Sequence, residues 1–203
     1  MVIGIINYGF SNITSVKNAV YELGYDYRIL GLSDNPNIDD FTHMILPGVG
    51  NFGSASDSLY NSNFSDFIHA WVNDDKPILG ICLGMQLLFN GSEESTNSPG
   101  LAFIPGTVKK LPITNRLRIP HIGWNEIEII QSDLLTEGVK SHCDMYFVHS
   151  YYCPISEYTV AKTYYGVEYS SVLKKGNIVG MQFHPEKSQK NGLNILNNFL
   201  ELV

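Results

Sequence analysis

Short apolar runs alternate with expected helices along the first half of the chain. Four runs have the length and composition of buried strands, namely residues 2–6, 27–30, 44–46 and 77–81. Apolar residues recur at helical spacing in residues 13–23 and 64–71, and a further helix is expected to begin at Met85 and continue to Phe89. This alternation of strand and helix predicts a mostly parallel sheet covered by helices.

The pattern changes after Gly91. Residues 92–100 are polar and are expected to form a loop, while five later runs have the composition of strands: residues 124–130, 145–152, 158–165, 170–174 and 178–183. Short turns such as residues 175–177 predict antiparallel hairpins. A last helix is expected to carry one apolar face, made of Leu193, Leu196, Leu200 and Val203. We therefore expect an α/β fold with a mostly parallel central sheet, flanking helices and an added antiparallel portion, in a single domain over residues 1–203.

Composition and charge narrow the class of protein. The chain has 203 residues, of which 44% are hydrophobic and 16% charged, so it can bury a sizeable core. Its net charge is −7 and its basic residues are not clustered, which argues against nucleic acid or an anionic membrane as a partner. Neither a signal peptide nor a run of about 20 apolar residues is visible. Three cysteines without framework spacing favour reduced thiols, and the expected location is the cytoplasm.

Cys82 lies between two glycines, in the segment Gly80-Ile-Cys-Leu-Gly84, where an apolar run gives way to an expected helix. Small flanking residues permit the tight strand-to-helix turn that exposes a nucleophile. The positive end of the following helix favours the reactive thiolate. The alternative is a buried core residue, since free cysteine is among the most buried residue types. Cys143 and Cys153 lack this setting, and we interpret both as structural.

A base for such a nucleophile is present in the segment Gln182-Phe-His-Pro-Glu-Lys-Ser188. His184 and Glu186 are two residues apart in an extended stretch, so their side chains can point the same way. Glu186 can then accept a hydrogen bond from His184 and fix its tautomer, as the third member of a catalytic triad does. The alternative is a polar loop after a strand. The remaining histidines are scattered, no metal-ligand spacing occurs, and neither a metal nor a cofactor is expected.

The segment Gly48-Val-Gly-Asn-Phe-Gly53 matches the dinucleotide-binding pattern G-x-G-x-x-G. Its context does not fit that function, because it follows the third expected strand and lacks an acidic residue at the end of the next one. A glycine-rich strand end can also present free backbone N–H groups to an oxyanion. A dinucleotide-binding oxidoreductase remains a disfavoured alternative, which titration with a nicotinamide cofactor would test.

These motifs together resemble the class I (triad) glutamine amidotransferases. Six segments are more similar to the glutaminase subunits of imidazole glycerol phosphate synthases within that class: residues 8–9, 46–53, 80–88, 120–125, 146–151 and 182–188. The cysteine elbow and His-x-Glu are shared by the whole class, whereas Pro-His-Ile-Gly-Trp-Asn and the lysine after the triad glutamate are more particular to these subunits. The resemblance runs nearly end to end.

The resemblance implies a role for each matching residue. Cys82 would attack the side-chain amide of glutamine, with His184 as acid and base and Glu186 orienting it. Backbone N–H groups of Val49 and Leu83 would form the oxyanion hole. The glutamine would be held by Gly50, Gln86, Ser150 and Tyr151. Ammonia would pass through a channel to a cyclase subunit of (β/α)₈ type in a heterodimer of the histidine pathway, whose contact surface would include Pro120, His121, Trp124, Asn125, Tyr146 and Lys187.

Three other functions on the same scaffold remain alternatives. Asn7 stands where an aspartate is common before Tyr-Gly, and residues 10–12 replace a more usual Met-Gly-Asn. These departures leave the ammonia acceptor open, because related subunits also serve nucleotide-sugar modification in surface polysaccharide pathways. A glutaminase subunit of pyridoxal phosphate synthesis has a similar size and triad but different flanking motifs. A non-catalytic regulatory subunit would usually lack the cysteine or the histidine, and both are present here.

Overall fold

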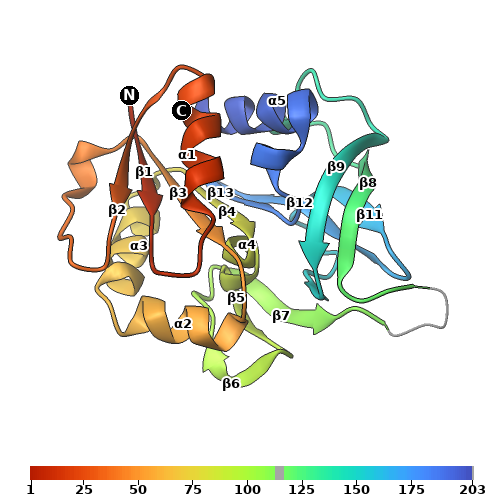
Figure 1. Ribbon diagram of the computed structural model, residues 1–203, viewed down its shortest axis with the longest axis horizontal. Helices are drawn as coiled ribbons and strands as arrows, with labels where there is room; N and C mark the ends of the chain where they lie inside the picture. The colour runs from red at the N-terminus through yellow and green to blue at the C-terminus, as the bar shows by residue number, and fades with distance from the viewer. Residues whose placement is uncertain (113–116, 203) are drawn as a thin grey trace.

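The computed structural model describes residues 1–112 and 117–202 and is built around a nine-stranded sheet (Figure 1). The strand order is β2-β1-β3-β4-β13-β12-β11-β8-β9. In chain order these strands are β1 (Val2–Ile6), β2 (Asp26–Leu30), β3 (His43–Gly48), β4 (Ile78–Cys82), β8 (His121–Ile129), β9 (Cys143–His149), β11 (Thr159–Tyr164), β12 (Glu168–Lys175) and β13 (Ile178–Met181).

One half of the sheet is parallel and the other antiparallel, as expected. Strands β2, β1, β3, β4 and β13 pair in parallel, whereas β13, β12, β11, β8 and β9 pair in antiparallel fashion. In the parallel half, Gly48 pairs with Cys82 and Met181 pairs with Ile81. The segments that follow β3, β4 and β13 therefore leave the sheet at the same carboxyl edge. The predicted α/β class, with a parallel sheet and an added antiparallel portion, is confirmed, and the two portions share one sheet.

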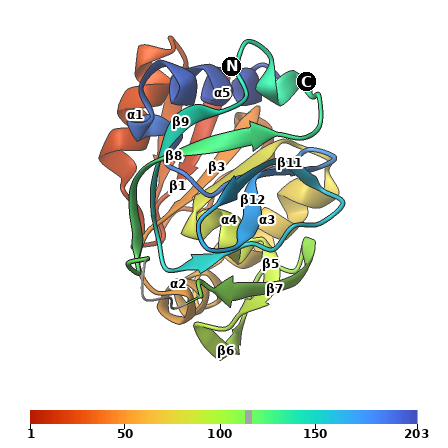
Figure 2. The same ribbon diagram turned by 90° about the vertical axis from the view of Figure 1, so that its right-hand side faces the viewer.

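Helices cover both faces of the parallel half (Figure 2). Helix α1 (Ile13–Glu22) and helix α5 (Gln189–Leu200) pack on one face, while α2 (Phe52–Tyr60), α3 (Phe64–Asn73) and α4 (Leu83–Leu87) pack on the other. Side chains of a strand alternate between the two layers. Ile5 of β1 contacts the α1 and α5 layer, and Ile6 contacts the opposite one. The described residues also form three short 3₁₀ helices: η1 (Ile38–Asp40), η2 (Leu134–Thr136) and η3 (Pro185–Lys187).

Two expectations about the middle of the chain are corrected, and one helix was missed. Residues 92–100 are not a loop, because β5 (Phe89–Ser92) and β6 (Ser95–Pro99) pair there and join β7 (Ile104–Lys110) and β10 (Tyr151–Tyr152) in a second sheet of order β10-β7-β5-β6. The helix expected to reach Phe89 ends at Leu87, since Phe89 opens β5. Helix α2 was not expected. Asn51 caps it by accepting a hydrogen bond from the Ser54 amide at 3.0 Å.

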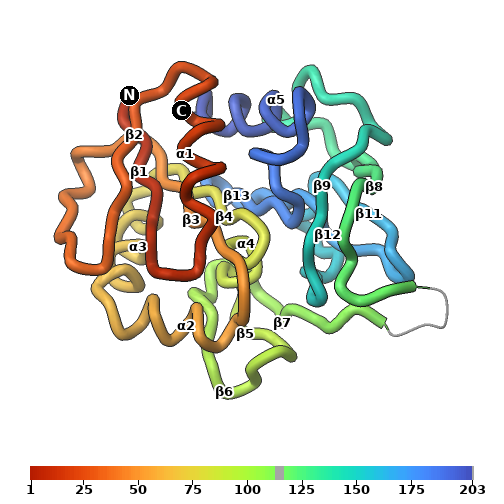
Figure 3. The backbone as a smooth tube through the Cα atoms, in the orientation of Figure 1, coloured from red at the N-terminus to blue at the C-terminus, as the bar shows by residue number. Residues whose placement is uncertain are grey.

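The two ends of the chain lie at the amino edge of the parallel strands (Figure 3). The Thr42 amide donates to the Val2 carbonyl at 3.1 Å, and His43 Nε2 lies 2.9 Å from the Leu202 carbonyl oxygen. The expected C-terminal helix is confirmed as α5, and Val203 lies outside the described residues. No helix within residues 1–112 and 117–202 is long and apolar enough to cross a membrane.

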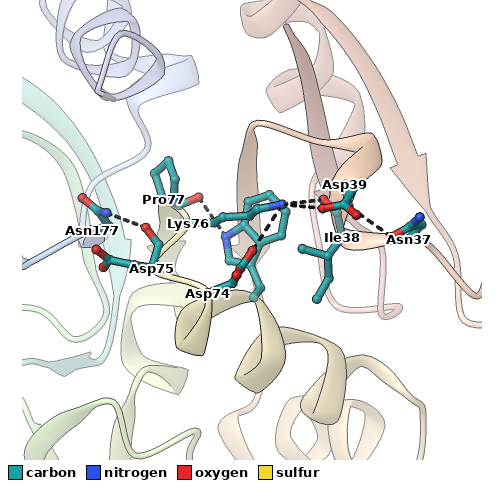
Figure 4. A network of polar contacts seen from close by, with 9 residues as sticks. Asn37, Ile38, Asp39, Asp74, Asp75, Lys76, Pro77 and Asn177 are labelled. Carbon is teal, nitrogen blue, oxygen red and sulfur yellow. Dashed lines mark hydrogen bonds and ion pairs between the residues drawn. The ribbon is translucent and has the colours of Figure 1, made fainter.

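A polar network at this amino edge ties three loops together (Figure 4). The Lys76 ammonium donates to the Ile38 carbonyl at 3.1 Å and pairs with Asp39 and Asp74 at 3.4 and 3.5 Å. It also lies 5.2 Å from the centroid of Trp71. Both carboxylates are exposed, so each ion pair is worth only about 0–1 kcal/mol. The network fixes the loop entering β4 and leaves the carboxyl edge free for a site.

Candidate active site

Cys82 occupies a strained turn between β4 and α4. Its φ is 55° and its ψ is −109°, a region that favours glycine and costs a larger residue roughly 1–3 kcal/mol. The neighbouring glycines make the turn possible. A Cβ atom on Gly84 would overlap the Leu46 carbonyl oxygen, and one on Gly80 would lie 2.6 Å from the Gly84 oxygen. Strand β3, strand β4 and helix α4 therefore approach too closely for any side chain at these two positions.

His184 and Glu186 form a buried pair at the same edge. His184 Nδ1 lies 2.8 Å from Glu186 Oε1, and their side chains are 4% and 0% exposed. Because Glu186 accepts from Nδ1, the Nε2 atom of His184 is left for the pocket that it lines together with Cys82. Within the described part of the chain, Glu186 Oε2 has no hydrogen-bond partner, so the carboxylate is held by His184 alone.

The charges around His184 favour its protonated form. Burial lowers its pKa, but the negative charges of a Cys82 thiolate and of Glu186 more than offset this, so that the pKa is raised to about 10. A cationic imidazole beside a thiolate is the resting form of an activated cysteine nucleophile. The arrangement can therefore hold a nucleophile and a proton donor ready in the same site.

The segment after β3 carries the backbone donor that was expected to stabilise an oxyanion. The Val49 N–H instead donates to the Phe10 carbonyl oxygen at 2.7 Å. Gly50, the next residue, has a φ of +102°. In this conformation the Val49 donor is therefore engaged with its own chain rather than presented to a substrate. Leu83, the other expected donor, opens helix α4 directly after Cys82.

A cavity of about 270 Å³ brings most of the sequence-predicted site together. Ten of those residues line it: Val49, Gly50, Cys82, Leu83, Gln86, Pro120, Ser150, Tyr151, His184 and Lys187. Glu186 lies behind His184. Within the described ranges, no group of three or more His, Cys, Asp or Glu side chains is arranged to hold a metal ion.

The residues expected at a partner contact divide into two groups. Trp124 is 48% exposed, its ring meets that of Tyr146 edge-on at 5.7 Å, and Lys187 Nζ lies 5.9 Å from the Tyr146 centroid. We call Trp124, Tyr146 and Lys187 the β8–β9 surface. His121 is different, because alternation along β8 turns it inward, where it is only 3% exposed. The expectation that its side chain faces a partner is corrected, and Asn125 is partly buried beside it.

Sequence reasoning missed three polar residues around the cavity. Gln182 accepts from Gln86 Nε2 at 3.2 Å and places its own Nε2 atom 3.8 Å from the Cys82 sulfur. It precedes His184 by two residues in an extended stretch, and that spacing was a usable signal. Glu94 lines the cavity and accepts from the Phe52 amide at 2.8 Å. His149 also lines it, and only the folded chain brings Glu94 and His149 there.

The burial of His121 and His149 makes the free energy of unfolding depend on pH. Burial lowers the pKa of His121 to about 4 and that of His149 to about 3, the latter helped by the neighbouring His121. Both pKa values lie below the ordinary value of about 6.5. Between the folded-state pKa and pH 6.5, the unfolded chain therefore binds more protons than the folded chain does. The stabilisation is complete above about pH 6.5 and is lost as the pH falls towards 4, by up to about 1.4 kcal/mol per pH unit for each histidine.

Urea unfolding at pH 7, 6 and 5 measures this loss. The free energy of unfolding of His149→Gln should fall less steeply with decreasing pH than that of the wild type. Equal slopes would contradict the assignment.

The family model for glutamine amidotransferase class-I matches residues 4–203. The chain belongs to this family. Proteins named imidazole glycerol phosphate synthase subunit HisH are among the relatives of this amidotransferase. The one from Methanocaldococcus jannaschii is 45% identical over 99% of this chain and 100% of its own length, and the one from Caldanaerobacter subterraneus is 44% identical over 99% and 98%.

Solved structures show the same fold at low sequence identity. The structure of PurLQS from Thermotoga maritima has a TM-score of 0.75 at 19% identity and covers 98% of this chain and 97% of its own. A structure described only as a glutamine amidotransferase has a TM-score of 0.74 at 16% identity, covering 99% and 98%. These similarities establish the fold of the amidotransferase, while the family rests on the sequence matches.

Proposed function

We propose that this amidotransferase hydrolyses glutamine through a thioester on Cys82 and supplies the ammonia to a partner subunit. The observation that carries this proposal is the buried His184–Glu186 pair, with its 2.8 Å hydrogen bond, lining one cavity with a cysteine on a strained turn. Relatives spanning the whole chain are named as subunits of imidazole glycerol phosphate synthase. Their names support a multi-subunit assembly.

The proposed reaction has two steps. The Cys82 thiolate attacks the side-chain carbonyl of glutamine, and His184 donates its proton to the leaving nitrogen, so that ammonia departs and a thioester remains. Water then attacks the thioester, with His184 taking a proton from it, and glutamate is released. Glu186 keeps the imidazole oriented in both steps. A positioned acid or base of this kind contributes about 10²–10⁴-fold.

The cavity residues fit glutamine as the substrate. Gln86 lines the pocket, and its Nε2 atom donates to the Tyr151 carbonyl at 2.9 Å. Gly50, Ser150 and Tyr151 line the walls and offer backbone and hydroxyl groups to the amino-acid end of the substrate. The proposed binding set is therefore the one expected from the sequence.

The proposed partner is a cyclase subunit of (β/α)₈ type that binds over the mouth of the cavity. The β8–β9 surface adjoins this mouth, because Lys187 belongs to both. It presents the aromatic rings of Trp124 and Tyr146, a residue type that is common at the centres of protein interfaces, and the Lys187 ammonium beside them. The ammonia would enter the partner and react with its phosphoribosyl-bearing aminoimidazole carboxamide substrate.

The protein alone should hydrolyse glutamine very slowly, and the partner carrying its acceptor should raise the rate by orders of magnitude. The reason is the Val49 N–H, which donates to the Phe10 oxygen and must rotate to reach an oxyanion. Gly48 permits this rotation, because glycine reaches backbone angles that other residues avoid. One oxyanion donor is worth about 10²–10³-fold. A partner that favours the rotated peptide by a few kcal/mol would present the Val49 N–H to the oxyanion and restore this rate.

Steady-state glutaminase kinetics test this for the protein alone, with a purified cyclase subunit, and with the subunit plus acceptor. A lone protein as fast as the complete complex would overturn the idling mechanism. The same experiment compares acceptors. Stimulation by the aminoimidazole carboxamide intermediate supports the histidine pathway, whereas stimulation by a nucleotide sugar with its own partner would assign the protein to surface polysaccharide synthesis.

Lys187→Ala should weaken the complex without damaging the triad. Its ammonium lies over Tyr146 at the cavity mouth, where it can pair with a carboxylate of the cyclase. Loss of one member of a buried interfacial pair costs about 2–5 kcal/mol. Calorimetry gives the affinity, and the ratio of glutamate to final product reports coupling. Lys175→Ala, at the last residue of β12 and at the opposite edge of the sheet, is the matched control. If both variants bind like wild type with unchanged coupling, Lys187 is not in the interface.

A further inference from the structure

Three buried polar side chains, of which His149 lines the cavity, form a closed cluster that the proposed chemistry does not use. The distances are 3.1 Å from His121 Nδ1 to His149 Nε2, 3.2 Å from His149 Nε2 to Tyr169 Oη, and 3.3 Å from Tyr169 Oη to His121 Nδ1. Their exposures are 3%, 5% and 0%. An unsatisfied polar group costs about 1–3 kcal/mol when buried, so the hydrogens of the cluster must be consistently arranged.

The direction of the hydrogen bonds follows from the ends of the cluster. The Tyr151 carbonyl can only accept, so His149 Nδ1, 2.9 Å away, carries the proton. A neutral His149 then presents Nε2 as an acceptor, and His121 Nδ1 donates to it. This leaves His121 Nε2 as an acceptor, which matches the Asn125 amide nitrogen 3.4 Å away. Both ends give the same direction, from Asn125 through the two imidazoles to the Tyr151 oxygen.

The carbonyl at the end of this chain lies in the wall of the glutamine pocket. The polypeptide leaves one sheet at His149 and joins the other at Tyr151, and residues 148–151 line the cavity. The Tyr151 oxygen also accepts from Gln86 Nε2 at 2.9 Å. Together with Gln182 Oε1, which accepts from the same nitrogen at 3.2 Å, this oxygen sets the orientation of the Gln86 amide, the proposed substrate contact.

The surroundings of His121 restrict its movement. Its ring is stacked on Tyr165, with centroids 3.9 Å apart and planes 18° apart, and it lies 5.1 Å from Phe147 at 20°. An imidazole held between two aromatic rings keeps its Nδ1 atom directed at His149. The donor is thereby pre-oriented rather than selected from several rotamers.

We propose that His121 and His149 are positioning residues that fix the Tyr151 carbonyl, and through it Gln86, in the geometry that binds glutamine. This inference rests on the proposed glutaminase function of the same cavity. Neither imidazole touches the reacting atoms. Both act by directing one N–H towards the pocket, so the role belongs to the Nδ1 position of each ring.

Asparagine and glutamine substitutions separate this role from packing. The amide nitrogen of asparagine can take the place of Nδ1, whereas that of glutamine reaches the place of Nε2. His149→Asn and His121→Asn should therefore keep the donor directed at the pocket, and His149→Gln and His121→Gln should lose it. Glutamine fills more of the space of histidine than asparagine does. A packing role consequently predicts the opposite order.

The readout is alkylation of Cys82 in the full chain by two reagents, a chloromethyl ketone analogue of glutamine and iodoacetamide. We expect each glutamine variant to raise the half-saturating ketone concentration about tenfold, the effect of one lost buried hydrogen bond, and each asparagine variant to remain closer to wild type. The iodoacetamide rate should change little. An equal or reversed order of the two substitutions would overturn the inference. A wild-type protein without saturation by the ketone, and without protection by glutamine, would instead overturn the glutaminase function.

Discussion

Cys82→Ala is expected to abolish glutamine-dependent synthesis by the complex while leaving ammonia-dependent synthesis intact. The substitution removes the nucleophile, and loss of a triad nucleophile lowers the rate by about 10⁶-fold. External ammonia bypasses this step, because it enters the partner directly. The other cysteines are poor substitutes, since burial raises the pKa of both Cys143 and Cys153 and neither lines the cavity.

The reconstituted pair is assayed with glutamine and then with an ammonium salt at alkaline pH. Cys143→Ala, on strand β9 outside the cavity, is the matched control and should retain both activities. Glutamine turnover by Cys82→Ala would show that another residue is the nucleophile. Loss of the ammonia-dependent activity as well would place the defect in the partner contact.

His184→Ala should be nearly as damaging as loss of Cys82, and Glu186→Ala should be about ten- to a hundredfold less severe. Nucleophile and base act as a unit, whereas an orienting group is partly replaceable. The structure gives this ordering a physical basis. Glu186 reaches only the far nitrogen of His184, at 2.8 Å, and contacts the cavity through it. Without Glu186 the imidazole still lies beside Cys82 but is free to turn.

Glutaminase rates of the two variants in the complex provide the measurement, and circular dichroism confirms that both are folded. Glu186→Gln serves as a control that retains the shape and a hydrogen-bonding oxygen but removes the charge. A folded Glu186→Ala that is slower than His184→Ala would reverse the two assigned roles.

The layout of the parallel half of the main sheet was predictable because most of its strands contain a short apolar run. Apart from His43 at the start of β3, strands β1, β3 and β4 contain no charged or strongly polar residue that would confuse their assignment. The second sheet was not predictable, because β5 and β6 read Phe-Asn-Gly-Ser and Ser-Thr-Asn-Ser-Pro. Strand β5 is held by pairing with β7, and β6 is held by contact with α2. The local sequence of β5 and β6 reveals neither partner.

The candidate site was predictable where a residue carries its own local signal. Cys82 has flanking glycines, and His184 and Glu186 have two-residue spacing. His121 was misplaced because its motif resembles a contact segment, whereas the strand alternation that buries it depends on where β8 begins. The engagement of the Val49 N–H with Phe10 is a contact across 39 positions, which no motif reports.

The crowded glycines have a consequence for reading variation in this protein. At Gly80 and Gly84 a side chain would collide with backbone atoms, whether or not Cys82 is chemically active. A library of random substitutions selected only for folded protein should therefore return glycine at both positions while Cys82 and His184 drift. Selection for glutamine turnover should recover all four. Comparing the two selections separates residues that the fold requires from residues that catalysis requires. The same comparison would identify proteins of this fold that have lost catalytic activity.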